Sequence, residues 1–526
     1  MPPSLLFGES NDLDQCQVVI GSSHVAPHII AKNDVGMSLR NLLLALSALA
    51  LMCIGSGACN AQGKPAAKLD PAQIEEIVRR SYQYVAMYNV NNKFAMDPAN
   101  PMSTGGWNKV RANTALADHT LKAIARPNND TLYAAAMLDL RDEPVILEAP
   151  AFDSVYVSLM ATGYDHYVNI PMSTGQGDFS KPSRILFYSK RTRSYEGEKV
   201  EGIDKTVEMT GDFISAIYRV MPHIAAPDRL KRNLEAMQSI KVKTLTQYKA
   251  KTRRRLRVLP WNSPPGILRN LSRKRTSAEF PAFGKTDFDV FENNLLEVMQ
   301  FVFNHTTFDP DDELDQKLLA IYAPLGVVPG RAHDPGKVAE IDGATFREVA
   351  RRIARTELAK TTDPKIVKEN VLGLFQPKGR MTLERLVFQS VSGPIGQPAS
   401  EAVYPPIATT DGSPMNAKHD YVLRMKKKDL PPAKAFWSAT LYNTENGFFI
   451  PNDRKKYSVG ENGGYKLNAE GGIEIHIAAE KPAGVPEENW LPINRGDYGI
   501  DIVMRIYAPD LERYKNWPPP KVERVK

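Results

Sequence analysis

The richest group of polar side chains lies in residues 126–133, which read Arg-Pro-Asn-Asn-Asp-Thr-Leu-Tyr. They supply a guanidinium, two amides, a carboxylate, a hydroxyl and a phenol, from Arg126, Asn128, Asn129, Asp130, Thr131 and Tyr133. Proline and asparagine favour a turn, and the apolar run 132–140 that follows predicts a strand. We therefore expect these polar groups at the entrance to a β-sheet, where they can form a site.

This stretch suits three kinds of chemistry. Amides and hydroxyls can bind sugar hydroxyl groups, carboxylate and amide oxygens can bind a hard cation such as calcium, and Asp130 can act as a base. The structural alternative is a turn in which Asn128 and Asp130 accept hydrogen bonds from nearby backbone N–H groups. The sequence names no cofactor. It also lacks the spacing of a zinc helix or a calcium loop, so no metal-ligand set is predicted.

His119 and His166 are the histidines best placed for proton transfer. His119 follows Asp118 shortly before the polar stretch, and His166 follows Asp165 between two tyrosines. Either could exchange a proton with Asp130 in a hydrolase, and the alternative is that both are ordinary surface or core histidines. No Gly-x-Ser-x-Gly elbow, Walker loop or dinucleotide fingerprint occurs, so a serine-hydrolase or nucleotide site is not supported.

A second group of candidates lies near the C-terminus. In residues 500–507 the side chains alternate, so that Asp501 and Arg505 are expected on one face of a strand and the apolar residues on the other. Trp437 and Arg505 could line a cleft that stacks on a sugar or an arene. The alternative for the tryptophan is a place in the core of a β-sheet domain.

The N-terminal residues predict export. Met37 and Arg40 are followed by the apolar run 42–54 and by small residues, which is typical of a signal peptide spanning residues 37–61 and cleaved before Gln62. We expect a periplasmic or secreted protein, with residues 1–36 as a disordered upstream extension. A lipoprotein anchored at Cys53 or Cys59 ranks second, because the residues around both fit a lipidation motif poorly.

Cysteine and charge exclude several classes of function. The three cysteines are Cys16, Cys53 and Cys59, so thiol catalysis, zinc–thiolate sites and iron–sulfur clusters are excluded from residue 60 onward. The net charge is +7, and residues 241–275 contain no acidic residue. No nucleic-acid motif accompanies this basic segment, so no specific nucleic-acid partner is predicted. It is a solvated connection or a contact with an anionic envelope surface.

Periodicity divides the chain into β-rich and helical parts. Asp70 and Pro71 begin a helix, short runs of period two follow from residue 132, helical patterns fill about 287–374, and strands return after 376. The chain is expected to divide into five parts. Residues 1–36 are the upstream extension and residues 37–61 the signal peptide. An N-terminal β domain with a leading helix follows at 62–225, a basic linker with a helical block at 226–375, and a C-terminal β domain at 376–526.

Several motifs resemble a bacterial two-domain family. Residues 126–133 and 138–140 resemble the signature of domain of unknown function 1254. Four later segments resemble domain of unknown function 1214, at residues 435–442, 489–492, 504–509 and 517–519. The resemblance implies a mainly β fold with α, in which a helical block links two antiparallel β-sandwich (jelly-roll-like) domains, and it implies export but no reaction. Residues 162–169 depart from the family pattern, which puts a shared ligand in doubt.

These observations favour an exported protein that binds a small molecule or glycan near residues 126–133. One alternative is a cofactor-free or cation-assisted hydrolase that uses Asp130 with a histidine. Another is a structural or assembly protein of the envelope. The sequence leaves the substrate and the oligomeric state open.

Overall fold

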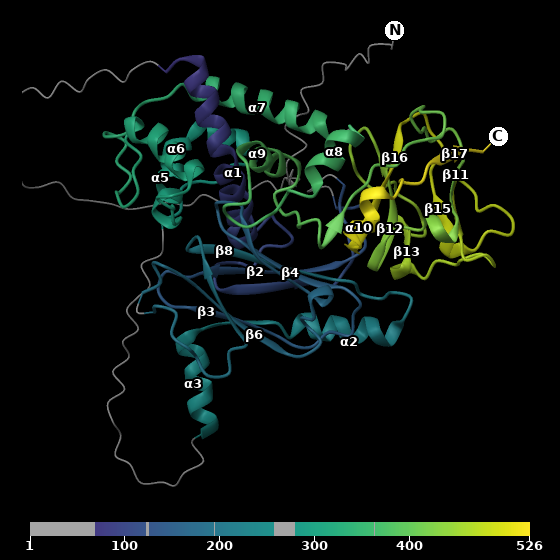
Figure 1. Cartoon of the computed structure of the whole chain (residues 1–526), viewed down its shortest axis with the longest axis horizontal. Coiled ribbons are helices and arrows are strands. Elements are labelled where there is room, and N and C mark those ends of the chain that lie inside the picture. Colours follow the sequence, from purple (N-terminus) through teal and green to yellow (C-terminus); the bar gives the residue numbers. More distant parts are fainter. Residues whose placement is uncertain (1–68, 122–125, 194, 257–278, 362, 526) are drawn as a thin grey trace, which may run out of the picture.

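The computed structural model describes residues 69–121, 126–193, 195–256, 279–361 and 363–525 (Figure 1). The segments predicted as an upstream extension and a signal peptide, all three cysteines and residues 257–275 of the basic segment lie outside these ranges. Within them, no helix combines the length and the apolar character needed to cross a bilayer.

The N-terminal part is built from two sheets. Sheet A has the strand order β1-β2-β8-β4-β5, and sheet B has the order β7-β6-β3-β9. The strands are β1 (Lys109–Asn113), β2 (Leu132–Asp139), β3 (Val145–Ala149), β4 (Val157–Thr162), β5 (Val168–Ser173), β6 (Ser183–Ser189), β7 (Lys205–Met209), β8 (Phe213–Val220) and β9 (Lys241–Thr244). One hydrophobic core lies between the two sheets and contains Leu138, Leu159 and Ile214 from sheet A and Leu147 and Phe187 from sheet B.

The period-two runs mark five of these strands, β2, β3, β4, β6 and β7, within two residues at each end. All pairs are antiparallel except β6 with β7. The sequence of residues 228–245 has a helical pattern, which predicts a single helix, and the structure shows that this prediction is wrong. Helix α2 (Pro227–Gln238) is followed by β9, because Val242 and Thr244 pair with Leu147 and Val145 at the edge of sheet B. Helix α3 (Leu245–Leu256) follows directly.

Helices cover the face of sheet A that is turned away from sheet B (Figure 1). They are α1 (Pro71–Met96), α4 (Asp287–Asn293), α5 (Leu295–His305), α6 (Glu313–Tyr322), α7 (Gly343–Lys360) and α9 (Leu383–Ser392). Helix α8 (Pro364–Val371) lies beside the C-terminal strands, and its Val371 packs against their core. Helix α1 begins as expected, with Asp70 and Gln73 forming a reciprocal capping box and Pro71 in the first turn. Its apolar residues share one core with α4, α5, α6, α7 and α9.

The C-terminal part has two further sheets. Sheet C has the order β10-β16-β12-β13, and sheet D has the order β15-β14-β11-β17. Their strands, and the helix that precedes β17, are β10 (Ala402–Val403), β11 (Tyr421–Met425), β12 (Ala433–Asn443), β13 (Ser458–Gly460), β14 (Ile473–Ala478), β15 (Trp490–Pro492), β16 (Ile500–Pro509), α10 (Leu511–Asn516) and β17 (Val522–Arg524). Four sheets with helices between the two β-rich parts confirm a mainly β fold with α.

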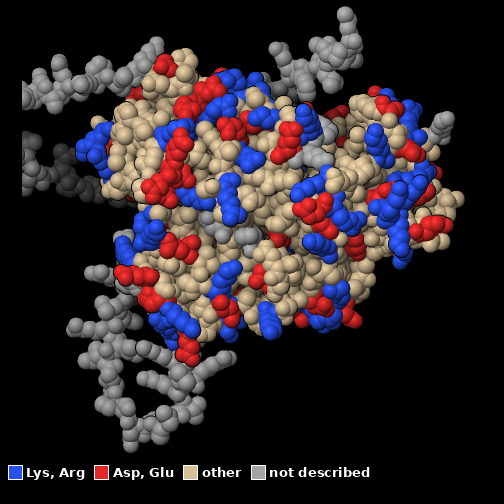
Figure 2. All heavy atoms as spheres, viewed as in Figure 1, with Lys and Arg blue, Asp and Glu red and all other residues tan. Residues whose placement is uncertain are grey.

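The two faces of β16 differ as the alternation predicts. Ile500, Ile502 and Met504 lie in the core between sheets C and D. Arg505 and Tyr507 lie on the other face, which contacts the N-terminal sheets. The surface in Figure 2 carries basic and acidic residues interspersed over the visible face.

Candidate interdomain binding site

Residues 126–131 join the two β-rich parts. The Arg126 backbone N–H donates to the Gly447 carbonyl at 2.7 Å, and its guanidinium pairs with Asp501 at 2.6 Å. The Pro127 carbonyl accepts a hydrogen bond from the Tyr442 hydroxyl at 2.6 Å. Arg126 has φ +51°, in the left-handed region, so the chain turns sharply here before it enters β2. We call residues 126–131 the interdomain turn.

Asp130 lies in the centre of this contact and is 1% exposed. Its Oδ2 accepts hydrogen bonds from the Ser438 hydroxyl at 2.6 Å and the Tyr507 hydroxyl at 3.1 Å. Asn128 accepts from the Asp130 backbone N–H at 2.7 Å, which closes an Asx turn, and donates to Tyr507 at 2.9 Å. The carboxyl is therefore bound to sheet C and not to its own turn.

Arg505 is the buried cation of the same contact. Its Nη1 donates to the Thr440 hydroxyl at 2.9 Å, and its Nη2 donates to the Tyr442 hydroxyl at 2.6 Å and to the Arg126 carbonyl at 3.2 Å. Burial alone would lower the pKa of Arg505, but Tyr442 and Asp130 outweigh it and raise the pKa above its ordinary value. The side chain therefore stays charged between the two domains.

Asn129 and Thr131 differ in whether their side chains make hydrogen bonds. Asn129 donates to the Ala117 carbonyl at 2.6 Å and accepts from the Ser458 hydroxyl at 3.2 Å. Thr131 is buried, and its hydroxyl has no hydrogen-bond partner in the described part of the chain. Within the interdomain turn, Thr131 thus has a buried hydroxyl that makes no hydrogen bond to the described residues.

Beside the turn, one row of polar residues crosses the whole of sheet A. In the strand register, Tyr133 lies opposite Asn113 on one side and Arg219 on the other, Arg219 lies opposite Ser158, and Ser158 lies opposite Ser173. Directly opposed residues point to the same face of a sheet, so these five side chains share one face. We call them the polar row.

The segment between α9 and β10 covers the polar row. Gln397 donates to the Ser158 hydroxyl and accepts from the Tyr156 hydroxyl at 3.0 Å. One carboxylate oxygen of Glu401 accepts from Ser173 at 2.9 Å. The other oxygen is buried and has no partner among the described residues. Burial raises the pKa of Glu401, because it outweighs the hydrogen bonds that favour the charged form.

Arg219 is the charged member of the polar row. It is only 5% exposed, and not all of its N–H groups have hydrogen-bond partners among the described residues. Its Nη2 donates to the Ile395 carbonyl, and its guanidinium lies 5.5 Å from the centre of the Tyr133 ring. Its Nη1 has no partner within the described ranges. Burial alone would lower the pKa of Arg219, but the phenols of Tyr133, Tyr404 and Tyr156 raise it, so the group stays cationic.

Tyr404 connects this region with solvent. The residue is 37% exposed, whereas burial of its hydroxyl raises the pKa of the phenol, so the ring is reachable while the hydroxyl lies inside. Sequence reasoning missed Arg219, Glu401 and Tyr404. One signal was present, because Arg219 is the single charged residue in the apolar run 213–220.

Comparison with known proteins places both β-rich parts in described families. Residues 107–244 match the family model described as "Protein of unknown function (DUF1254)", and residues 401–511 match "Protein of unknown function (DUF1214)". The chain carries a DUF1254 domain followed by a DUF1214 domain. This confirms the resemblance stated from the motifs, including the order of the domains.

A solved structure shares the fold. The VPA0106 protein from Vibrio parahaemolyticus is 21% identical and superposes with a TM-score of 0.61 over 86% of this chain and 100% of its own. An uncharacterized protein from Burkholderia cenocepacia is 14% identical over 86% of this chain and 94% of its own, with a TM-score of 0.37, too low to support a shared fold. No curated protein matches the chain.

Neither histidine proposed for proton transfer has a hydrogen bond to Asp130 among the described contacts. His119, which precedes the DUF1254 signature, contacts the Tyr457 hydroxyl at 2.7 Å. His166 is buried, with Nδ1 at 2.7 Å from the Ser390 hydroxyl and Nε2 at 2.9 Å from the Pro394 carbonyl. Burial lowers the pKa of His166 to about 4, so it is neutral at pH 7. The described residues contain no cluster of three or more His, Cys, Asp or Glu placed to hold a metal ion.

Trp437 lies on the inner face of sheet C. It is 2% exposed, packs in the DUF1214 core, and its ring lies 5.2 Å from that of Tyr465. Arg505 lies on the opposite face of the same sheet, so the structure does not bring these two residues into one cleft.

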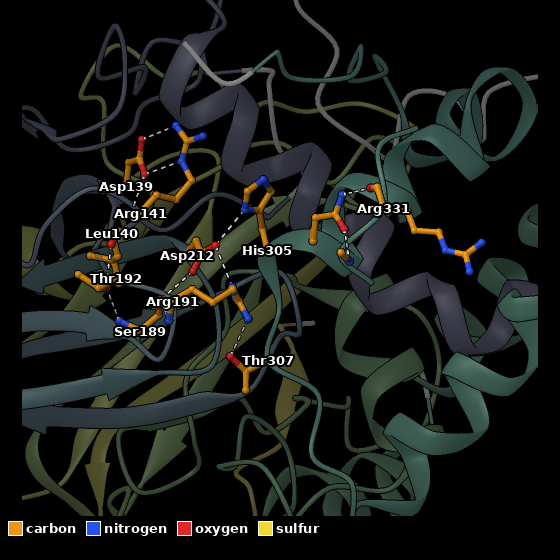
Figure 3. A network of polar contacts seen from close by, with 12 residues as sticks. Asp139, Leu140, Arg141, Ser189, Arg191, Thr192, Asp212, His305, Thr307 and Arg331 are labelled. Atoms are coloured by element: carbon orange, nitrogen blue, oxygen red, sulfur yellow. Dashed lines mark hydrogen bonds and ion pairs between the residues drawn. The ribbon is translucent and has the colours of Figure 1, made fainter. Parts of the chain in front are cut away.

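A second polar network lies at the other end of β8 (Figure 3). Asp212, just before the strand, accepts hydrogen bonds from the Ser189 hydroxyl at 2.7 Å, Arg191 Nε at 3.1 Å and His305 Nδ1 at 2.9 Å. Arg191 also donates to Thr307 at 3.0 Å. Because the carboxylate stands between the serine and the histidine, this is not the order of a nucleophilic triad. It links sheet B, sheet A and α5.

Proposed function

We propose that this protein binds a small hydroxylated molecule with an acidic group, such as a sugar acid, between its DUF1254 and DUF1214 domains. The observation that supports this most strongly is Arg219, a buried cation whose Nη1 has no partner in the described residues. A buried donor of a charged group that is left unsatisfied costs at least about 1–3 kcal/mol. An anionic ligand group at the polar row would remove that cost.

The neighbouring groups suit the rest of such a ligand. The hydroxyls of Thr131, Tyr133 and Tyr404 can donate to or accept from sugar hydroxyls. The free oxygen of Glu401 adds a further acceptor. In this proposal Asp130 is a positioning residue, since its contacts with Ser438 and Tyr507 hold the turn that carries Thr131.

The binding test is calorimetric titration of the full chain with glucuronate, with glucose as the neutral comparison. We expect glucuronate to bind, and glucose to bind with at least a tenfold lower affinity, which corresponds to a binding free energy weaker by about 1.4 kcal/mol. Arg219→Gln should weaken the binding of glucuronate by at least about tenfold, because a hydrogen bond to a charged group contributes about 1.5–3 kcal/mol.

Arg184→Gln is the matched control, because Arg184 is a half-exposed arginine on sheet B of the same domain. It should bind glucuronate like the wild type. Tyr404→Phe removes only a hydroxyl and should keep the fold while weakening binding a few-fold. Equal affinity of the wild type and Arg219→Gln, or no heat from any sugar acid, would refute the proposal.

We also propose that the protein acts in the periplasm or outside the cell. The support is the pattern of residues 37–61, with Ala61 before the expected cleavage point. A sugar acid would then be met outside the cytoplasm.

A further inference from the structure

A hollow of about 590 Å³ opens on the surface of the DUF1214 domain. It lies where the turn before β11, the turn before β16 and the end of β17 meet, and it is lined by Lys418, His419, Asp420, Arg495, Arg524 and Val525. In Figure 1, β11 and β17 lie at the edge of the molecule remote from the DUF1254 sheets, so this hollow is separate from the polar row. Its volume is in the range of sites for small molecules.

Internal bonds fix the shape of the hollow. The Val525 backbone N–H donates to the Asp420 carbonyl at 2.9 Å, which ties the end of β17 to the turn before β11. Arg495 pairs with the Asp420 carboxylate at 2.6 Å and so ties in the turn before β16. Asp420 also accepts from the Ala479 backbone N–H at 3.2 Å. The Asp420 carboxylate therefore already has partners within the protein.

The positive charge of the hollow is in excess. Lys418, Arg495 and Arg524 outnumber the two acids around them, Asp420 in the lining and Asp497 beside it, so an excess of one positive charge remains. Lys418 has an exposed partner in Asp497 at 2.6 Å. Arg524 has no carboxylate partner within the described residues, and its Nη2 lies 2.9 Å from Nδ1 of His419.

This last contact defines the state of the histidine. An arginine can only donate, so Nδ1 of His419 must accept and the proton of the neutral ring sits on Nε2. The hollow therefore combines donors of four side chains, three of them cationic, and its one lining carboxylate is already paired with Arg495. Such a set matches an anionic group with several acceptor oxygens, such as a phosphate.

We propose that this hollow binds a phosphate group carried by a small molecule. The donors of Arg524, Arg495 and Lys418 would bind the phosphate oxygens, and the half-exposed Val525 would contact the attached organic part. The site does not depend on the sugar-acid site, because none of its residues belongs to the interdomain turn or the polar row.

The test is titration of the full chain with inorganic phosphate and with glycerol 3-phosphate at low ionic strength, followed by calorimetry. We expect both to bind the wild type, with Arg524→Gln weakening both by at least about tenfold. Arg424→Gln is the matched control, because Arg424 lies on the neighbouring strand β11, pairs with Glu474 and Glu523, and does not line the hollow. It should bind like the wild type.

Tighter binding of glycerol 3-phosphate than of inorganic phosphate would support the ester as the ligand, and equal binding would support phosphate alone. Unchanged affinity in Arg524→Gln would overturn the proposal. So would a loss of phosphate binding in Arg219→Gln with none in Arg524→Gln, because the anion would then occupy the interdomain site. Circular dichroism of each variant checks that it is folded.

Discussion

Asp130 and Arg505 are buried charges of opposite sign that come from different domains. Each has hydroxyl partners of its own. The Asp130 carboxylate accepts hydrogen bonds from Ser438 and Tyr507, and the Arg505 guanidinium donates to Thr440 and Tyr442. Hydroxyl groups that donate to a carboxylate and accept from a guanidinium satisfy both charges without direct pairing. The contact is therefore specific in geometry as well as in charge.

Asp130→Asn should destabilise the protein by about 2–3 kcal/mol, because two hydrogen bonds to a buried charge are weakened and Arg505 loses a nearby negative charge. Urea unfolding at pH 7 measures the change. Asp501→Asn is the control in the same interface, since its ion pair with Arg126 is about one-third exposed and should contribute less than about 1 kcal/mol. Equal effects of the two substitutions would show that the buried carboxylate has no special role.

Glu461 makes stability depend on pH. Burial raises the pKa of its carboxyl from 4.5 to about 7, although Trp437 donates its backbone N–H to it at 2.9 Å. Between these pH values the folded form binds more protons than the unfolded form, so stability falls as the pH rises. Glu461→Gln should therefore be more stable than the wild type by up to about 3 kcal/mol at pH 8 and equal to it near pH 4.5.

Thermal unfolding of both forms from pH 4.5 to 8 tests this. The amide oxygen of the introduced glutamine can still accept the hydrogen bond from Trp437, and its NH₂ group can donate to the Tyr465 hydroxyl, which in the wild type donates to Glu461 at 3.2 Å. A wild type that gains stability over the variant as the pH rises would contradict the prediction.

At the scale of elements, β8 carries both polar networks of the DUF1254 domain. Asp212 stands just before its first residue, and Arg219 is its last residue but one. The strand between them is apolar and buried, so the two networks are held at a fixed separation. One network joins the sheets to the helices, and the other faces the DUF1214 domain.

Asp212→Asn should cost about 2–3 kcal/mol at pH 7, because the acid accepts three hydrogen bonds. Burial alone would raise its pKa, but His305 and Arg191 outweigh that and lower the pKa of Asp212 below 3.8. A lowered pKa stabilises the fold above pH 3.8, and this is lost as the pH falls below it. The difference between variant and wild type in urea unfolding should therefore shrink from pH 7 to pH 3.

Asp142→Asn is a suitable comparison, since Asp142 is half-exposed and lies 3.6 Å from Arg193. It should change stability by less than about 1 kcal/mol at either pH. If the difference between Asp212→Asn and the wild type grew towards acid pH, the assigned direction of the pKa would be wrong.

The sequence predicts local elements better than it predicts the contacts between them. Capping residues define the start of α1, and alternation defines both faces of β16, because these signals involve neighbours in the chain. The partners of Asp130 are 308 and 377 residues away, and nothing local indicates them. The polar row depends on the strand order β1-β2-β8-β4-β5, which no single segment encodes.

Local sequence patterns also give a wrong prediction for the edge strand β9 of sheet B. The helical pattern continues beyond Gln238, but residues 241–244 pair with β3 and the pairing prevails over propensity. Arg219 was missed for a related reason. A lone arginine in an apolar run has meaning only once the neighbouring strands are known.

At the scale of the whole molecule, the domains are joined through packing as well as polar contacts. Tyr507 stacks on Phe436 at 4.1 Å between ring centres and lies 5.1 Å from Tyr156 of the DUF1254 domain. Aromatic pairs of this kind add about 0.5–1.5 kcal/mol beyond burial. The aromatic contacts therefore add to the polar contacts that hold the two domains together at the proposed site.

Export can be tested on the whole chain. Mass spectrometry of the mature protein, produced in a bacterium with an intact secretion system, should show Gln62 as the first residue. The protein should be recovered from the periplasm or the medium. Recovery in the cytosol with residues 37–61 intact would contradict export, and a lipid-modified Cys59 would favour the lipoprotein alternative.

The long sequence separation across the interdomain turn has a kinetic consequence. Residues 126–131 leave the ribosome more than 300 residues before Ser438 and Tyr507, so their acceptors and donors stay hydrated until the last sheet exists. Contacts that close such large loops form late and slowly. The final, rate-determining step of maturation should accordingly be the docking of two already formed halves, and the proposed ligand site should form only at that moment.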